Sequence, residues 1–176
     1  GSGIPTMGNV HEIAQRADPG ARVVYVDWDP VVSAHADLLL EHNEGASMIQ
    51  ADLCAPDTVL GAAETQRLLD LDQPVGLVMI GAFHFVPDEQ HPLEIMAAYR
   101  DRLASGSYLV LSHISPDHSP EAVAAAVAVS TRGWDRLYPR SRAEIRALFA
   151  GFDLVAPGLV STPLWRPGPC DTVPPD

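Results

Sequence analysis

The sequence predicts an α/β fold in which a mostly parallel sheet is covered by helices on both faces. Short runs of β-branched residues alternate with helical stretches, which is the pattern of strands joined by crossover helices. One run, Val75–Ile80, is continuously apolar, as expected of a central strand buried on both faces. At 176 residues, 47% of them hydrophobic, the chain fits one globular domain with a single core.

The chain starts with a glycine-rich turn, Gly1–Thr6, that leads into a helix near Val10 and Ile13. In a doubly wound fold such a turn follows the first, central strand, and here no strand precedes it. Gly1 and Ser2 alone would also fit the remnant of a tag, but the residues after them favour a severed loop.

The first visible strand is Arg22–Val26, which closes at Asp27. The next helix has Asp29 as N-cap and Pro30 at its first position, where the missing proline N–H costs nothing. A second short strand is predicted over residues 48–51.

That second strand closes at Asp52, and a helical segment follows around residues 57–70. After the apolar strand, residues 92–104 have the pattern of a helix, and a further strand is predicted over 108–112.

The C-terminal part begins with a helix whose start is marked by Ser119 and a proline in the first turn. Ser141 and Glu144 form a capping box for the next helix, and Gly151 is placed to end it. Residues 152–166 are strand-like but interrupted by prolines, which suits the edge of a sheet. We therefore predict one domain over 1–166 and a proline-rich tail over 167–176.

Charge is unevenly distributed. Residues 1–99 contain 15 of the 23 acidic residues but 3 of the 11 basic ones, and the remainder is balanced. The formal net charge of −12 therefore lies in the N-terminal part, which argues against general nucleic-acid binding and against a basic membrane-surface protein. The sequence has no lysine, so Schiff-base chemistry and a P-loop lysine are excluded.

Neither cysteine, Cys54 or Cys170, belongs to a Cys-x-x-Cys pair, and the first residues lack a secretory signal. No run approaches the ~18–20 apolar residues that cross a bilayer. We expect a reduced, cytoplasmic setting and no membrane partner.

The first chemical pattern is a glycine-rich turn followed about 20 residues later by an acid at a strand end. Glycine lets the backbone approach a ligand closely, and Asp27 can accept hydrogen bonds from both ribose hydroxyls of an adenosine. Dinucleotide-binding enzymes use the same geometry, but their third glycine falls where this chain has Thr6. A turn glycine with a surface aspartate is the purely structural alternative.

Asp52 closes the second strand. If that strand lies beside the Asp27 strand, both carboxylates reach the carboxyl edge of the sheet, where open α/β folds bind ligands. Asp52 could accept from an adenine amino group, and the Leu53 amide could reach a ring nitrogen. Trp28 could pack on the adenine or serve packing alone.

The loop Gly81–Asp88 follows the apolar strand to the same edge. His84 and Asp88 could therefore approach the reacting group of a ligand, and His84 is the better general base because its reference pKa is about 6.5. The alternative is a histidine that holds the loop through a hydrogen bond.

Neither His84 with Asp88 and His91 nor His113 with His118 has the spacing of zinc ligands, so we predict no bound metal. Five arginines form the one basic group, which could grip an acidic substrate or lie on a solvated face: Arg132, Arg136, Arg140, Arg142 and Arg146.

Seven segments, in matching order from residue 1 to about 167, resemble a family of S-adenosylmethionine-dependent methyltransferases long catalogued only as a domain of unknown function. They are GSGIPTMGNVHEIAQ, VVYVDWDPVVSAHA, QADL, HFVPDE, LASGSYLVLSH, RSRAEI and VSTPLWRP. The resemblance implies a Rossmann-like class I methyltransferase fold with a seven-stranded sheet, and S-adenosyl-L-methionine as cofactor.

The resemblance also implies a set of cofactor-binding residues: Gly1, Gly3, Asp27, Trp28, Asp52, Leu53, Ala82 and Phe83. Gly1 and Gly3 would lie against the methionine end and Asp27 against the ribose. Asp52 and Leu53 would read the adenine.

Ala82 and Phe83 would line the transfer site, with His84 as the candidate catalytic residue. Family members usually carry leucine in place of Phe83 and asparagine in place of Trp28. Members also begin upstream with helices and a strand of the form F-L-D-I-G, and they continue into a last glycine-rich strand. We therefore expect residues 1–176 to be a fragment lacking the first strand, which would lie between the Asp27 strand and the apolar strand.

The function predicted is methyl transfer to a small-molecule acceptor, at an N, O or C atom that the sequence does not identify. Two alternatives remain at this point. One is a Rossmann oxidoreductase dependent on NAD(P) or another nucleotide, and the other is a cofactor-binding module without turnover.

Overall fold

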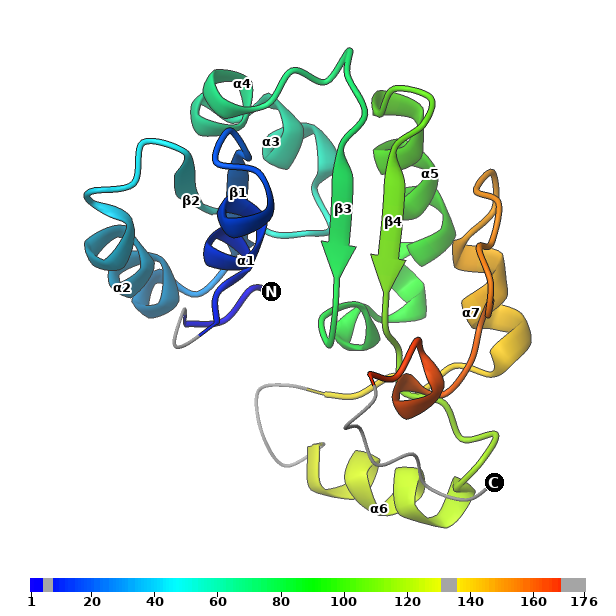
Figure 1. The fold of residues 1–176 in the computed structure, drawn as a ribbon. Helices are drawn as coiled ribbons and strands as arrows, with labels where there is room; N and C mark the ends of the chain where they lie inside the picture. Colours follow the sequence, from blue (N-terminus) through cyan, green and yellow to red (C-terminus); the bar gives the residue numbers. More distant parts are fainter. Residues whose placement is uncertain (5–7, 131–135, 169–176) are drawn as a thin grey trace.

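Two pairs of parallel strands form the centre of the molecule (Figure 1). The computed structural model describes residues 1–4, 8–130 and 136–168. β1 (Val23–Asp27) pairs with β2 (Ala46–Gln50), and β3 (Gly76–Met79) pairs with β4 (Tyr108–Leu111). The predicted α/β class with parallel strands is confirmed.

Helices connect these strands in the predicted order. Their bounds are α1 (Val10–Ala17), α2 (Pro30–Leu40), α3 (Pro56–Gly61), α4 (Ala63–Leu68), α5 (Pro92–Arg102), α6 (Pro120–Ser130) and α7 (Arg142–Leu148). Two of the predicted caps are confirmed. Asp29 accepts a hydrogen bond from the Val31 amide at 2.8 Å, and Ser141 and Glu144 form the reciprocal capping box that begins α7.

The helix predicted around 57–70 is wrong in its continuity, because the chain breaks it at Ala62. Ala62 has extended backbone angles, φ −60° and ψ 145°, between α3 and α4. The buried Thr65 hydroxyl then donates to the Val59 carbonyl at 2.7 Å, which satisfies an oxygen that a continuous helix would have used.

One hydrophobic core joins the two strand pairs, although no strand among the described residues connects β1 to β3. Its buried members come from both pairs and from the helices behind them: Ile49, Val59, Leu60, Met79, Phe83, Val86, Ile95, Met96, Tyr99 and Leu148. A smaller cluster packs α2 on β1 and β2 through Tyr25, Ala36, Leu40, Ala46 and Met48. Apolar burial therefore fixes the relative position of the two halves.

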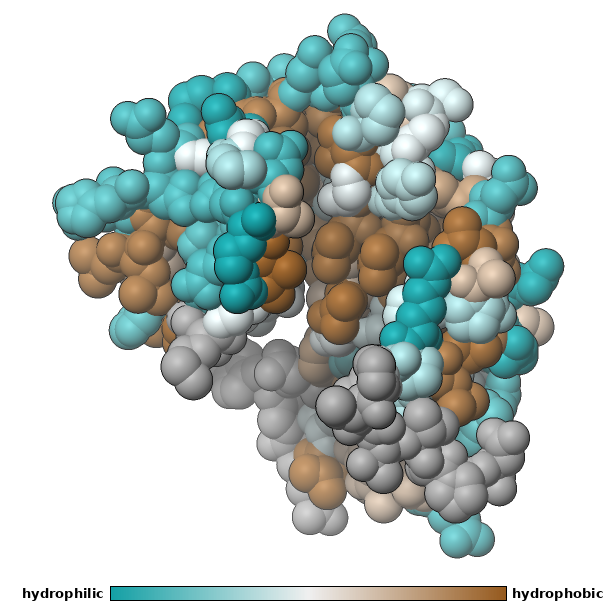
Figure 2. All heavy atoms as spheres, in the orientation of Figure 1, coloured by the Kyte–Doolittle hydropathy of each residue, from teal (hydrophilic) through white to brown (hydrophobic). Residues whose placement is uncertain are grey.

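β3 is not buried on both faces, so that prediction is wrong for the described structure. Leu77 and Met79 face the core, whereas Val78 is exposed, as are Tyr108 and Val110 on β4. Figure 2 shows hydrophobic side chains over β3 and β4 on the face in view. The alternation arises because α5 lies behind this strand pair and the opposite face is open (Figure 1).

The edge strand predicted over 152–166 is also wrong, because the described structure has only a short 3-10 turn there, Thr162–Leu164. Prolines cannot donate to a sheet, which explains why the apolar residues of this segment form no ladder.

Residues 169–176, most of the predicted tail, lie outside the described residues, as does Cys170. None of the helices in the described ranges is long and apolar enough to cross a membrane.

Candidate functional site

The carboxyl ends of β1 and β2 bring two acidic residues to one edge. In the parallel register Asp27 lies opposite Gln50, and the Ala51 amide donates to the Asp27 carbonyl at 2.9 Å. Asp52 follows directly, so both acids lie at the same edge, as the sequence predicted.

Asp27 is the most constrained acid at this edge, with 5% of its surface exposed. One carboxylate oxygen accepts from the Gly3 amide at 2.9 Å, and the other accepts from the Asp29 amide at 3.0 Å. Each oxygen has two lone pairs, and among residues 1–4, 8–130 and 136–168 each accepts one hydrogen bond, which leaves one lone pair for a further donor. The buried carboxylate is thus oriented by backbone and can still accept from a pair of hydroxyl groups.

Gly1 lies where the glycine turn packs against the loop that follows β3. The nitrogens of Gly1 and Ser2 both donate to the Val26 carbonyl, at 2.7 and 3.0 Å. A Cβ atom built on Gly1 would lie 2.7 Å from the Cβ atom of Ala82, closer than such atoms approach. Glycine is therefore required where the two strand pairs meet.

The Asp52–Cys54 turn presents a free donor and a carboxylate. The exposed Asp52 side chain accepts from the Cys54 amide at 2.8 Å, and the Tyr99 hydroxyl donates to the Leu53 carbonyl at 2.8 Å. The Leu53 amide has no hydrogen-bond partner in the part of the chain that the structure describes. Burial and the nearby Asp52 charge raise the pKa of the Cys54 thiol to about 12, so this thiol stays protonated.

Trp28 and Phe83 have opposite environments. Trp28 is 62% exposed beside Asp27, free to cover a ligand, and its carbonyl accepts from Gln50. Phe83 is fully buried in the main core, where it contributes about 1.5–3 kcal/mol through apolar burial. The Phe83 side chain thus anchors the loop from beneath, and only its backbone is available at the site edge.

His84 follows Phe83 in this loop. Its Nδ1 atom is buried and has no hydrogen-bond partner within the described ranges of the chain. Burial lowers the pKa of its ring, which therefore remains neutral near pH 7. The ring meets that of His113 edge-on, with centroids 5.8 Å apart. Asp88 does not join His84, because its carboxylate binds Arg140 instead.

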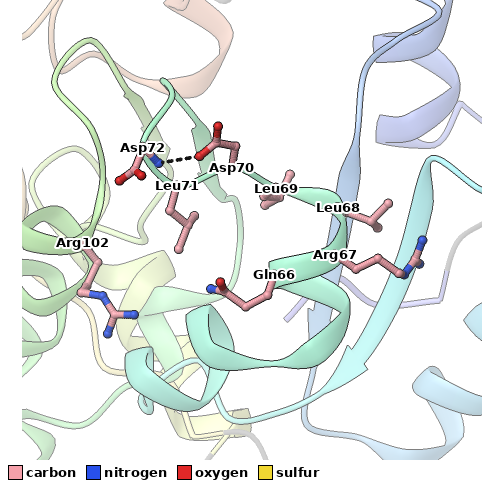
Figure 3. A pocket seen from close by; sticks show the side chains of 8 residues that line it. All are labelled: Gln66, Arg67, Leu68, Leu69, Asp70, Leu71, Asp72 and Arg102. Carbon is pink, nitrogen blue, oxygen red and sulfur yellow. Dashed lines mark hydrogen bonds between the residues drawn. The ribbon is translucent and has the colours of Figure 1, made fainter.

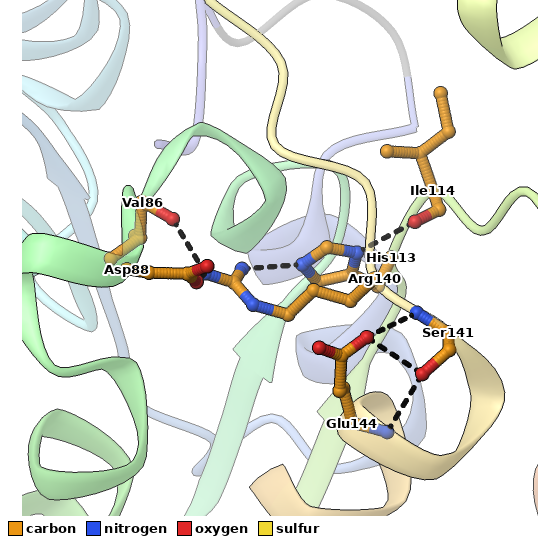
Figure 4. A network of polar contacts seen from close by, with 7 residues as sticks. All are labelled: Val86, Asp88, His113, Ile114, Arg140, Ser141 and Glu144. Atoms are coloured by element: carbon orange, nitrogen blue, oxygen red, sulfur yellow. Dashed lines mark hydrogen bonds and ion pairs between the residues drawn. The ribbon is translucent and has the colours of Figure 1, made fainter.

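Arg140 and His113 form a polar network that the sequence pattern did not indicate (Figure 4). The sequence placed Arg140 in a basic group with Arg132, which lies outside the described residues. Arg140 is in fact 5% exposed, and its guanidinium reaches Val86, Asp88 and His113. No spacing rule reports such a contact, since the partners come from segments that are far apart in sequence.

A separate hollow lies away from this edge, lined by α4, the turn after it and the end of α5 (Figure 3). Its charged side chains are of both signs, and Asp70 accepts from the Asp72 amide at 3.0 Å. None of the predicted site residues lines it. Among the described residues no cluster of three or more histidine, cysteine or acidic side chains is arranged to hold a metal ion.

Parallel strands with a glycine turn and a buried acid at their carboxyl edge are the arrangement found in α/β proteins that bind nucleotide cofactors. More narrowly, the chain belongs to the S-adenosyl methyltransferase family, which matches residues 1–174. This confirms the resemblance, and the cofactor of the family is S-adenosylmethionine. No match was found among curated proteins.

Two solved structures are similar to this chain. One is a DUF574 family protein from Streptomyces avermitilis MA-4680, with 37% identity and a TM-score of 0.91 over 96% of this chain and 65% of that one. The other is a candidate methyltransferase from Thermobifida fusca YX, with 36% identity and a TM-score of 0.90 over 95% and 62%. The chain therefore spans less than two thirds of either protein, and the Rossmann-like fold is confirmed.

The His113 environment predicts a pH-dependent stability. Burial and the Arg140 charge lower the pKa of His113 to about 4, whereas an unfolded histidine titrates near 6.5. Between these values the unfolded state binds more protons, so the free energy of unfolding should fall as the pH drops from about 6.5 to about 4. Denaturant unfolding at a series of pH values measures this.

In the same experiment His113→Gln should reduce this decrease in the free energy of unfolding, since glutamine takes up no proton in this pH range. The matched control is His42→Gln at an exposed histidine, and it should leave the decrease in the free energy of unfolding as large as in the parent. Identical pH profiles for both variants would show that His113 is not the group responsible.

Proposed function

We propose that this chain carries the S-adenosylmethionine site of an enzyme that methylates a small-molecule acceptor. The observation that supports this most directly is the buried Asp27 carboxylate, which is bound to the glycine turn and retains a lone pair on each oxygen. Two adjacent hydroxyl groups of a ribose match this pair of acceptors.

The remaining contacts at this edge are consistent with the same cofactor. Gly1 and Gly3 would border its methionine end, and Gly1 lies against Ala82, where a side chain has no space. The unpartnered Leu53 amide would donate to an adenine nitrogen, and the Asp52 carboxylate would accept from the adenine amino group. Trp28, which is exposed beside Asp27, would cover one face of the ring.

Ala82 and the backbone of Phe83 would border the transfer position, with His84 next to them. When bound, S-adenosylmethionine supplies a methyl group activated by a positive sulfonium. His84 would take the proton that the acceptor loses when it is methylated. The neutral ring is the form that can accept a proton.

The chain's other contribution is alignment and exclusion of water, because the sulfonium is already a strong electrophile. A small-molecule acceptor fits the acidic chain better than a nucleic acid, whose phosphates the net charge of −12 would repel.

Asp27→Asn should weaken binding of S-adenosylhomocysteine at least about 10-fold, because asparagine replaces one charged acceptor by an amide donor. Calorimetry of the full chain with S-adenosylhomocysteine and with NADH measures this. The exposed Asp37→Asn on α2 is the control and should bind like the parent. Binding of NADH in preference to S-adenosylhomocysteine would replace the proposal by the oxidoreductase alternative.

Gly1→Ala should also weaken this binding, because the new Cβ atom pushes the glycine turn away from Ala82. We expect a loss of about 10-fold, the scale of one hydrogen bond. Adding Ala82→Gly to the same chain removes the opposing atom and should restore most of the affinity. No recovery in the double variant would mean that this contact does not set the position of the turn.

His84→Gln should lower the rate of methyl transfer about 100-fold or more and leave S-adenosylhomocysteine affinity unchanged. Transfer of a radiolabelled methyl group to a panel of small amines, phenols and carbon acids measures the rate, with the exposed His35→Gln as control. A parent chain that binds the cofactor but methylates no member of the panel would favour the module without turnover.

A further inference from the structure

Arg140 is a buried cation whose guanidinium has three partners from two distant segments (Figure 4). Nη2 donates to the Val86 carbonyl at 2.8 Å and to the Asp88 carboxylate at 2.6 Å. Nη1 donates to Nε2 of His113, beyond the end of β4, at 2.9 Å. One side chain therefore connects the loop after β3 to the chain after β4.

The backbone before Arg140 makes the same connection. The Tyr138 amide donates to the His84 carbonyl at 2.8 Å, and the Arg140 amide donates to the Ile114 carbonyl at 3.1 Å. Residues 138–140 therefore lie between the His84 loop and the segment after β4. The side chain and the main chain of this segment both act on the loop that carries His84.

The contact with Arg140 also determines the state of His113. A guanidinium only donates hydrogen bonds, so Nε2 of His113 must accept with its lone pair. The ring proton is then on Nδ1, which donates to the Ile114 carbonyl at 2.9 Å. His113 is thus a neutral ring of one tautomer, and its edge-on contact with His84 presents a defined surface to that ring.

We propose that Arg140 is the positioning residue of the His84 loop: its guanidinium holds the loop against the end of β4 and fixes the tautomer of His113, on which the His84 ring rests. The inference rests on the proposed function, in which His84 accepts the proton. Arg140 acts through His84 and His113.

The planar guanidinium is needed because its donors diverge toward a carbonyl, a carboxylate and an imidazole at once. Asp88 is 82% exposed, so water competes for its charge and the ion pair alone contributes little. The Val86 carbonyl and the His113 ring are the contacts that water does not replace, since Val86 is buried and His113 partly so. These contacts therefore determine the position of the His84 loop and of the His113 ring, and the net charge of Arg140 matters less.

Ring spectra of ¹⁵N-histidine-labelled chain test the proposal without any acceptor. The parent should show His113 as a neutral ring protonated on Nδ1, and Arg140→Met should lose this single tautomer and shift the His84 signals. Arg140→Lys is the second variant for the case that Arg140→Met does not fold. Its ammonium cannot reach all three partners, so the His84 signals should shift there too.

The matched control is Arg102→Met, which removes an exposed ion pair between Arg102 and Asp57. It should leave both histidine rings unchanged. An unchanged His113 tautomer and unchanged His84 signals in Arg140→Met, or in Arg140→Lys where the former does not fold, would overturn the proposal.

Kinetics on the full chain add a readout that a general loss of stability would not produce. Arg140→Lys should lower kcat for methyl transfer about 10- to 100-fold, while the Kd for S-adenosylhomocysteine stays within about threefold of the parent. Equal losses of kcat and of cofactor affinity would overturn the positioning role. A parent chain without transferase activity would defeat the proposed function alone, because the ring spectra still decide the role of Arg140.

Discussion

A buried aspartate at the end of β1 connects three segments of this protein through hydrogen bonds. Asp27 accepts from Gly3 in the glycine turn and from Asp29 at the start of α2, while its own carbonyl accepts from Ala51 after β2. Burying such a charge is costly unless donors surround it, and here two backbone N–H groups supply them. The same residue therefore shapes the turn, positions α2 and keeps acceptor capacity for a ligand.

The two strand pairs are held in place by side chains rather than by a continuous ladder. Ile49 from β2 and Met79 from β3 belong to one buried cluster, with Phe83 fully enclosed in it. Phe83 lies between Ala82 and His84 in the chain, so its packing in the core determines the position of this loop at the carboxyl edge. The close approach of Gly1 to Ala82 then brings the glycine turn to that loop. The burial of Phe83 and the close approach of Gly1 to Ala82 therefore both determine where this loop lies relative to the glycine turn.

Local chemistry accounts for what the sequence predicted well. Alternating apolar runs specify the parallel strands, and Asp29 and Ser141 mark helix starts because their side chains satisfy free amides nearby in sequence. The open face of β3 depends on tertiary packing, which no local pattern reports, and the break at Ala62 comes with a hydrogen bond from Thr65 to Val59 that the hydrophobic pattern does not show. At the site, the edge shared by Asp27 and Asp52 follows from strand order. The burial of Arg140 does not, because its partners are more than 25 residues away.

The energetics of Arg140 explain why a cation is tolerated beneath the His84 loop. A buried guanidinium beside a buried charged partner would incur two desolvation penalties. Here Asp88 remains in water, His113 is neutral, and Val86 offers a carbonyl dipole, so one desolvated charge is distributed over three acceptors. Such an arrangement contributes little net stability but permits few alternative geometries, because moving the loop would leave the guanidinium donors unpaired in a buried position. Specific placement of His84 is what this arrangement provides.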